Sequence, residues 1–500
     1  MISNTGALIG IGIYFFIMIG IGYLLRNKNK SAEDFLVGGR SFGMLFNTGT
    51  LCACWIGGSI VIGIPGTVYN HGIWDTDAGW GILITIGSTL CLVVAGLFYM
   101  RRLWQLKLLS LGDFYYRRFG TKAGLLATVL MASTFTLWVA VQTVAFAKVG
   151  VTLVGLSLNT WIFIAIAVIC TYTILGGLWA VCLTDIIQVC IVTAGILIIT
   201  PMCINMAGGF DAVIANIPSE KLNFFPTESN INTWLAWTAG WVVLGLGNIP
   251  SPDLMQRAFS AKTANTARNS ALAATVIVGI LVLMVVFLAF AGMLMVKTGQ
   301  LDRALIEQDT EMLVPIMLQQ IMPTPVLALF LGAVLAAVMS AAATANIALS
   351  GIISKNLVKD LFIPNMSSHS LMQATRVVIL LVGILATFIA IGMPSVFILI
   401  TFGFDLILAC LFAPLTLGLF WKGANGTGAI AGMAAGFLSR VLFAGMINGF
   451  TLEGIGSPQE GWYYFTLSAP CISAIVMVVV SLLTQKRDKP ILLDLDPIED

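Results

Sequence analysis

Residues 42–69 read FGMLFNTGTLCACWIGGSIVIGIPGTVY, a hydrophobic segment of membrane-spanning length that is interrupted at Gly57-Gly58 and at Gly63-Ile64-Pro65-Gly66. A second segment, Trp234 to Arg257, is interrupted in the same way by Gly245, Gly247, Pro250 and Pro252. A break in a membrane helix frees backbone groups that lipid cannot satisfy, so it persists only where those groups line a cavity or bind a ligand. The two interruptions therefore predict the position of a binding site.

The spacing of these two segments predicts the fold. The second lies five predicted membrane segments after the first, as expected when two inverted five-helix repeats each begin with a discontinuous helix. Transporters built in this way bind substrate and coupling ion near the bilayer midplane, at the discontinuous helices. The pattern favours a secondary transporter.

Composition places the chain in a bilayer. Of its 500 residues, 58% are hydrophobic and 10% are charged, and the mean hydropathy is +0.98. A spanning helix needs ~20 mostly apolar residues. Thirteen such stretches begin near Gly6, Phe42, Gly79, Ala123, Trp161, Val181, Trp234, Ala271, Pro325, Thr375, Val396, Ala429 and Tyr463. We therefore expect an all-α integral membrane protein whose termini face opposite sides.

Lys and Arg residues indicate the orientation. With the N-terminus outside, twenty of the 25 fall in inside loops and three in outside loops, which is the bias that cytoplasmic loops show. We therefore expect an exterior N-terminus and an interior C-terminus. The net charge of +2 gives no indication of nucleic acid as a partner. All nine cysteines lie in apolar segments, where free Cys is a small hydrophobe.

The chain reads as one transporter domain, residues 1–486, followed by a short cytoplasmic tail, residues 487–500. We expect an extra N-terminal helix and inner loop (1–41), a first repeat (42–203), a second repeat (234–420) and C-terminal helices (421–486). Residues 297–322 carry four acidic side chains and are expected to form a partly helical lid over the exterior vestibule.

Acidic residues at membrane depth are costly, so each is a candidate for function. Asp185 shares a helical face with two polar side chains, which favours a sodium ligand or proton relay over a structural carboxylate bonded to a neighbouring helix. For Asp405, function and structural bonding stay equally open. Asp253 follows the second interruption, where it can simply cap the next half-helix. Asp113 lies at the inner edge.

Hydroxyl groups stand out in the small-residue run 336–346. Helix packing explains its alanines, but Ser340 and Thr344 lie four residues apart on one helical face. Hard cations such as Na⁺ need oxygen ligands. Beside the carbonyls freed at residues 53–57, Ser340 would nearly complete a five-oxygen cage.

Trp55 lies inside the first interruption, away from the membrane surfaces where most Trp residues anchor helices. Together with Trp138 it can form cation-π walls around an organic ammonium group. The alternative is hydrophobic stacking of a neutral or zwitterionic solute.

At these residues the chain resembles the sodium/solute symporter family over nearly its whole length, and within it the branch of the high-affinity choline transporter. The most specific matches are GGRS (38–41), WIGG (55–58), GIPG (63–66), YTILGGLW (172–179), GNIP (247–250) and LGAV (331–334). The resemblance implies a LeuT-type 5+5 inverted-repeat core preceded by one extra helix, with about 13 transmembrane helices in all.

The resemblance also implies ion sites. The family's main sodium site would use the carbonyls of Ala53, Ile56 and Ala337 and the hydroxyl of Ser340. A further sodium site of some members would use Asp185, Ser340 and Thr344. Ala341 and Ala343 stand where the family pattern has hydroxyl groups.

The implied solute site is only partly matched. Trp55 and Trp138 fit the aromatic cage of the choline branch, whereas Ser251 and Ile400 stand where that cage has two more Trp residues. We expect the cavity to be lined by Trp55, Trp138, Gln142, Trp241, Ser251 and Asp405. An amine or quaternary ammonium, a betaine, an amino acid and a carboxylate all stay open as solutes.

The function expected is Na⁺-coupled symport of a small organic solute into the cell by a multi-pass protein of the plasma membrane, or of the inner membrane in a bacterium. One alternative keeps the fold but uses proton coupling or no coupling, and another is a membrane ligand sensor. No constellation typical of an enzyme stands out. Small-residue helix faces permit an oligomer.

Overall fold

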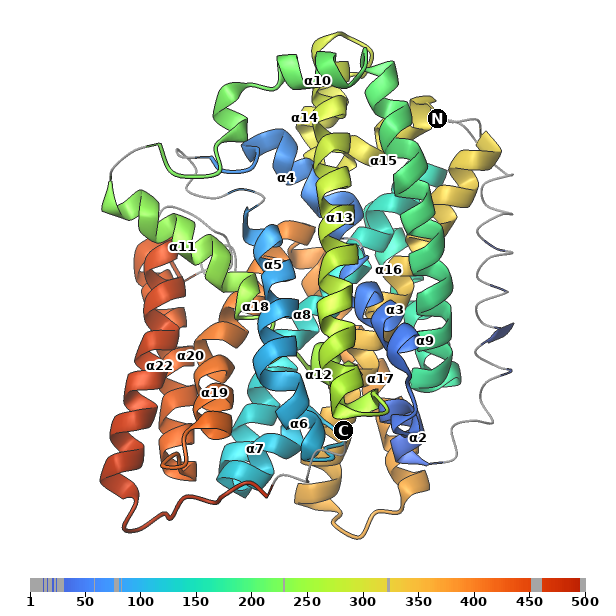
Figure 1. Ribbon diagram of the computed structural model, residues 1–500. Helices are drawn as coiled ribbons and strands as arrows, with labels where there is room; N and C mark the ends of the chain where they lie inside the picture. The colour runs from blue at the N-terminus through green and yellow to red at the C-terminus, as the bar shows by residue number, and fades with distance from the viewer. Residues whose placement is uncertain are drawn as a thin grey trace.

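A computed structural model describes residues 31–57, 59–75, 81, 83–227, 230–321, 324–450 and 461–494, together with positions 12, 16, 20, 21 and 24. The predicted first helix, near Gly6, lies mostly outside these residues. The described chain is almost entirely helical (Figure 1). Its isolated β-bridge joins Phe42 to Ala261.

Ten helical spans in the described part of the chain are long and apolar enough to cross a membrane, and one bent pair adds an eleventh. The ten are α5 (Leu83–Val94) with α6 (Arg101–Gln105), α8 (Thr121–Val154), two halves of α9 (Leu158–Met206), α13 (Ala264–Lys297), α16 (Thr324–Ile352), α17 (Ser368–Gly392), α18 (Val396–Ile407) with α19 (Ala413–Phe420), α20 (Gly426–Asn448) and α22 (Trp462–Thr484). These spans cover eleven of the twelve predicted stretches after the first, and the twelfth, near Trp234, contains the shorter helix α11 (Ile231–Gly245).

The bent pair is the first interrupted segment. α3 (Met44–Trp55) ends at Ile56, and after a π-helical turn the chain continues as α4 (Ile64–His71), at 48° to α3. The prediction of a second break at residues 63–66 was wrong, because Gly63 has helical angles and Pro65 sits in the first turn of α4, where its missing N–H costs nothing. Gly66 instead allows close approach, since a Cβ there would lie 2.9 Å from the backbone of Thr310.

The second interrupted segment is confirmed. α11 (Ile231–Gly245) ends in a turn over residues 246–250, and α12 (Pro252–Ser260) begins with Pro252 at its first position. A Cβ on Gly247 would lie 2.5 Å from the carbonyl oxygen of Phe404. Only glycine therefore lets this turn pack against α18.

A further break divides α9. Gly177 has φ 59° and ψ −173°, a combination that is essentially restricted to glycine. The 49-residue helix consequently separates into the spans Leu158–Leu175 and Gly177–Met206. These are the two stretches predicted near Trp161 and Val181.

Short helices cover both ends of the bundle (Figure 1). One end carries α10 (Phe210–Asn216), α14 (Arg303–Gln308) and α15 (Leu313–Ile321), and the other carries α2 (Ala32–Val37), α6 and α7 (Leu111–Phe119). The second end carries the Lys/Arg-rich loops and is the one predicted to face the interior. Residues 297–322 are therefore partly helical, as expected for the lid.

Asp113, at this interior end, has a structural role. Its carboxylate accepts the backbone N–H groups of Leu109 at 3.1 Å and Ser110 at 3.2 Å, in a capping box that begins α7. It also accepts the side-chain amide of Asn356 at 2.7 Å. Hydrogen bonds of this kind account for a buried carboxylate without a transport function.

We predict that Gly177→Ala destabilises the protein by about 1–3 kcal/mol, because any Cβ makes this backbone conformation unfavourable. The buried cysteines allow unfolding in detergent to be followed with a thiol-reactive dye. Gly279→Ala is the matched control, since Gly279 lies within α13 and a Cβ there meets nothing within 4 Å. Equal unfolding temperatures for the two variants would contradict the prediction.

Candidate functional site

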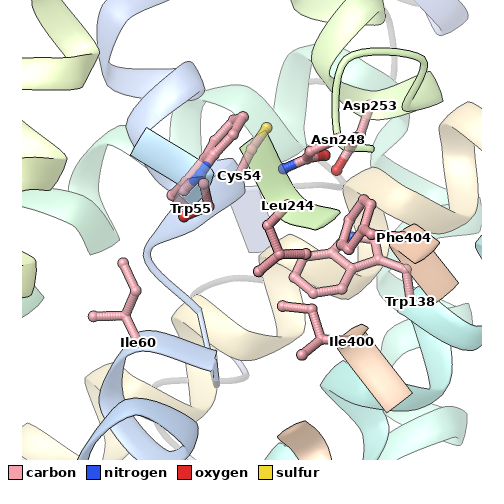
Figure 2. Close-up of a pocket in the computed structure, with 10 residues that line it drawn as sticks. Cys54, Trp55, Ile60, Trp138, Leu244, Asn248, Asp253, Ile400 and Phe404 are labelled. Atoms are coloured by element: carbon pink, nitrogen blue, oxygen red, sulfur yellow. The ribbon is translucent and has the colours of Figure 1, made fainter. Parts of the chain in front are cut away.

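Both interrupted segments border one small buried cavity (Figure 2). Its lining consists of Cys54 and Trp55 from α3, Ile60, Ser88 from α5, Trp138 from α8, Leu244 from α11, Asn248 from the turn, Asp253 from α12, and Ile400 and Phe404 from α18. The cavity measures about 20 Å³, which is room for about one water molecule. The lining must therefore move apart before an organic solute can enter.

Aromatic rings form much of the wall. The rings of Trp138 and Phe404 lie 5.4 Å apart at an interplanar angle of 60°, and Trp55 approaches from α3 (Figure 2). The indole N–H of Trp55 is buried and has no acceptor among the described residues. The indole N–H of Trp138 is in the same situation, so the wall offers π-faces together with two indole hydrogen-bond donors.

Asp253 supplies the charge of the cavity. It lies in the first turn of α12, and its Oδ1 accepts the backbone N–H of Leu254 at 2.7 Å. The side chain is buried, and it makes no ion pair within the described part of the chain. None of the ten lining residues is Lys, Arg or His. The cavity lining thus contains one acidic side chain and no basic one.

The other predicted solute residues lie around the cavity rather than in its lining. Gln142 contacts the first interruption, because a Cβ on Gly57 would lie 3.0 Å from its Oε1. Ser251 is the buried residue that precedes α12. Trp241 contacts Trp237 edge-to-face, with ring centroids 5.9 Å apart and an interplanar angle of 65°.

Asp405 also lies apart from the lining. It forms a buried ion pair with Arg440 of α20, whose guanidinium in turn lies 4.1 Å from the ring centroid of Phe465. Asp405 therefore has the structural bond to a neighbouring helix that was one of its two expected roles.

At the first interruption the backbone departs from the helical pattern. The Gly57 N–H donates to the carbonyl of Trp55 at 2.9 Å, so it no longer bonds the carbonyl of Ala53 four residues back. α16 packs beside this point, because a Cβ on Gly57 would lie 3.4 Å from Cβ of Ala341. A released carbonyl at Ala53, beside a helix that carries the Ser340 hydroxyl, provides oxygen ligands of the kind that Na⁺ prefers.

A buried ion pair joins α12 to α9, and the same arginine also bonds α16. Arg257 of α12 donates to Oδ2 of Asp185 at 3.0 Å and to the hydroxyl of Thr344 at 2.9 Å. The Ser340 hydroxyl donates to the other oxygen of Asp185. Both Asp185 and Arg257 are essentially inaccessible to solvent. In this conformation the cation that faces Asp185 and Thr344 is therefore a guanidinium.

The predicted exterior end is closed by charges. Lys148, at the outer part of α8, forms ion pairs with Asp309 at 2.7 Å and Glu311 at 2.6 Å on the lid. Glu311 also accepts the backbone N–H of Phe397 at 3.2 Å, at the N-terminus of α18, where an acid is favourable. These contacts hold the lid, α8 and α18 together.

The interior end is closed mainly by bonds to backbone carbonyls. The indole of Trp104 donates to the carbonyl of Ala261 at 2.7 Å, and Arg40 donates to that of Leu108 at 2.9 Å. The Phe42 N–H bonds the carbonyl of Ser260 at 3.1 Å. Both ends of the bundle are therefore tied in this structure.

We predict that Asp185→Asn and Arg257→Gln each cost about 3–5 kcal/mol of unfolding free energy, because each leaves its former partner as an uncompensated buried charge. The double variant should be more stable than the sum of the two losses implies. Denaturant unfolding of the four proteins tests this as a double-mutant cycle. Additive losses would mean that the two groups act independently.

Comparison with known proteins agrees with this architecture. Residues 35–436 match the Sodium:solute symporter family. The human high affinity choline transporter 1 is 28% identical over 463 residues, which is 88% of this chain and 77% of that one. The sodium/proline symporter of Haemophilus influenzae is 27% identical over 524 residues, 100% of this chain and 99% of that one.

Solved structures share the fold. A Na⁺-coupled sialic acid symporter in a substrate-bound, outward-open state has a TM-score of 0.80 at 18% identity, over 95% of this chain and 98% of that one. A nucleobase-cation-symport-1 family transporter has a TM-score of 0.56 at 14% identity, over 91% and 96%. The predicted LeuT-type architecture is thereby confirmed. With most of its length matched, this chain belongs to the sodium:solute symporter family.

Proposed function

We propose that this protein uses an inward Na⁺ gradient to carry a small organic cation, an amine, into the cell. The observation that supports this most directly is Asp253, a buried carboxylate without an ion-pair partner in the described chain, in a cavity walled by Trp55, Trp138 and Phe404. A buried charge is costly unless it is paired. A cationic solute would supply the missing charge.

The cavity chemistry distinguishes among the solutes that the sequence leaves open. Aromatic faces attract ammonium groups, and a carboxylate adds a charge-assisted hydrogen bond if the solute has an N–H. A carboxylate solute would face Asp253 with no cationic side chain in the lining. A betaine or an amino acid has a positive group that could face Asp253, but its own carboxylate would have no cationic side chain to pair with in the lining.

An amine with N–H donors suits the cavity better than a quaternary ammonium. Ile400 lines the cavity and Ser251 lies next to α12, so neither supplies the additional indole faces of the choline branch. A quaternary nitrogen depends on such faces because it has no N–H to give to Asp253. The similarity to choline and proline symporters supports a small nitrogen-containing solute in general.

For the ion, we place Na⁺ at the carbonyls of Ala53, Ile56 and Ala337 and the hydroxyl of Ser340, with Asp185 and Thr344 as candidates for a second ion. The released Ala53 carbonyl and the position of α16 support the first set. The second set would require Arg257 to move away from Asp185 and Thr344. The alternative is proton coupling through Asp185, whose partner in this structure is Arg257.

The direct test is uptake into liposomes that contain only the purified protein. Radiolabelled amines, quaternary ammonium compounds, betaines, amino acids and carboxylates would be compared under a Na⁺ gradient and in K⁺ buffer. Na⁺-stimulated uptake of an amine is expected. Uptake that responds to a pH gradient and not to Na⁺ would replace sodium by proton coupling, and binding without flux would favour a sensor.

We predict that Asp253→Asn weakens the apparent affinity for the amine about 10- to 100-fold, because it removes a charged hydrogen-bond acceptor from the solute. The measurement is the solute KM for Na⁺-driven uptake. Asp211→Asn is the control, since it removes the same charge from an exposed position on α10. An unchanged KM in a folded Asp253→Asn protein would exclude the proposed role.

We predict that Ala341→Ser lowers the Na⁺ concentration for half-maximal uptake, whereas Ser340→Ala raises it. The first change adds the hydroxyl that Ala341 lacks beside the interruption, and the second removes a hard-cation ligand. Na⁺ titrations of uptake at fixed solute would measure both. Ala343→Gly, on the same helix, controls for packing changes in α16. No response to either hydroxyl would argue that Na⁺ binds elsewhere.

A further inference from the structure

A second, larger hollow opens at the end of the protein that is predicted to face the interior, and it shares no lining residue with the central cavity. It measures about 630 Å³ and lies between the span Ile86–Gln105 and α19. The two elements are joined there by the hydrogen bond between the hydroxyls of Tyr99 and Thr416, at 2.8 Å. The C-terminal segment after α22 closes one side with Leu492 and Leu493.

Basic side chains surround this hollow. Arg101 and Arg102 lie at the interior end of one span, and Lys422 follows the end of the other. Arg102 and Lys422 are exposed, and neither forms an ion pair with an acidic side chain in the residues that the structure describes. The guanidinium of Arg102 lies 4.4 Å from the ring centroid of Phe420. The rim is therefore positively charged, with Arg102 held in place.

Apolar side chains continue from this basic rim toward the membrane. Leu97, Phe98 and Phe420 line the hollow and are 49%, 55% and 41% exposed. On a membrane-spanning helix such residues face acyl chains. The hollow thus has two surfaces that match the two parts of a phospholipid. The charged rim suits the headgroup, and the apolar wall next to it suits an acyl chain.

The hollow is rigidly framed. Arg118 is buried and donates to the backbone carbonyls of Gly418 at 2.7 Å, Trp421 at 2.9 Å and Ile491 at 2.6 Å. It thereby fixes the end of α19 against the C-terminal segment. Burial lowers the pKa of Arg118, but its carbonyl partners favour the charged form. Arg118 holds the walls, and Arg102 and Lys422 remain for a ligand.

We propose that this hollow binds one anionic phospholipid of the inner leaflet, with its phosphate between Arg102 and Lys422 and an acyl chain along Leu97 and Phe98. Basic pockets between membrane helices on the cytoplasmic side are suited to anionic headgroups. Charge complementarity and position at the membrane surface both support a lipid. The rival occupant is the protein's own acidic end, residues 494–500, which follows the Leu492-Leu493 wall.

The test uses the full-length protein in nanodiscs that contain phosphatidylglycerol or phosphatidylcholine, followed by gentle detergent extraction and native mass spectrometry. The wild type is expected to retain one phosphatidylglycerol and no phosphatidylcholine. The double variant Arg102→Gln/Lys422→Gln should lower its affinity for phosphatidylglycerol on the order of 30-fold, since each basic group near a membrane surface contributes several-fold.

The matched control is Lys122→Gln/Lys262→Gln. It removes two exposed basic groups at the same end of the protein, outside the hollow. Equal retention by the two double variants, or equal retention of both lipids by the wild type, would overturn the proposal. A chain that ends at Leu493 tests this rival occupant, because lipid that binds only after the truncation would identify the acidic end as the natural occupant. The site does not depend on the proposed transport function.

Discussion

Backbone groups inside a bilayer have to be hydrogen-bonded within the protein, and the structure is organised around the two places where its helices break this pattern. Both breaks are enclosed by other helices. The turn at Gly247 packs on the backbone of α18, and the break at Gly57 lies against Gln142 and Ala341. The same enclosure brings the ends of four half-helices to one cavity, so the constraint that buries the breaks also creates the site.

Two buried carboxylates near the breaks have opposite environments. Asp185 is bonded through both oxygens, to Arg257 and Ser340, whereas Asp253 makes no ion pair in the described chain and faces the cavity. Arg257 lies four residues after Asp253, one turn further along α12. A single short helix therefore carries both the guanidinium that pairs with Asp185 and the acid that lines the cavity. Asp185 and Asp405 are each paired with an arginine elsewhere.

Much of this could be predicted from the sequence because it depends on local signals. Gly and Pro marked both broken helices, and Trp55 and Trp138 were identified as cavity residues. The prediction of a break at residues 63–66 failed because Pro is tolerated in a first helical turn. The Lys/Arg distribution assigns Arg257 to an interior loop, and only its contacts with Asp185 of α9 and Thr344 of α16 show that it is buried. Asn248 lies within the predicted second interruption, but Phe404 joins the cavity through a contact between distant segments, for which a single sequence gives no signal.

The two closed ends differ in how readily they can open. Outside, Lys148, Asp309 and Glu311 are charged groups that regain hydration when they separate, which offsets part of the lost attraction. Inside, most of the closing bonds end on backbone carbonyls. Ala53 and Trp55 lie on the same last turn of α3, so an ion at the released carbonyl and a solute at the indole would order one structural element. Each ligand would then strengthen the binding of the other by the same factor. A turn ordered by both ligands would thus couple the binding of the ion to the binding of the solute.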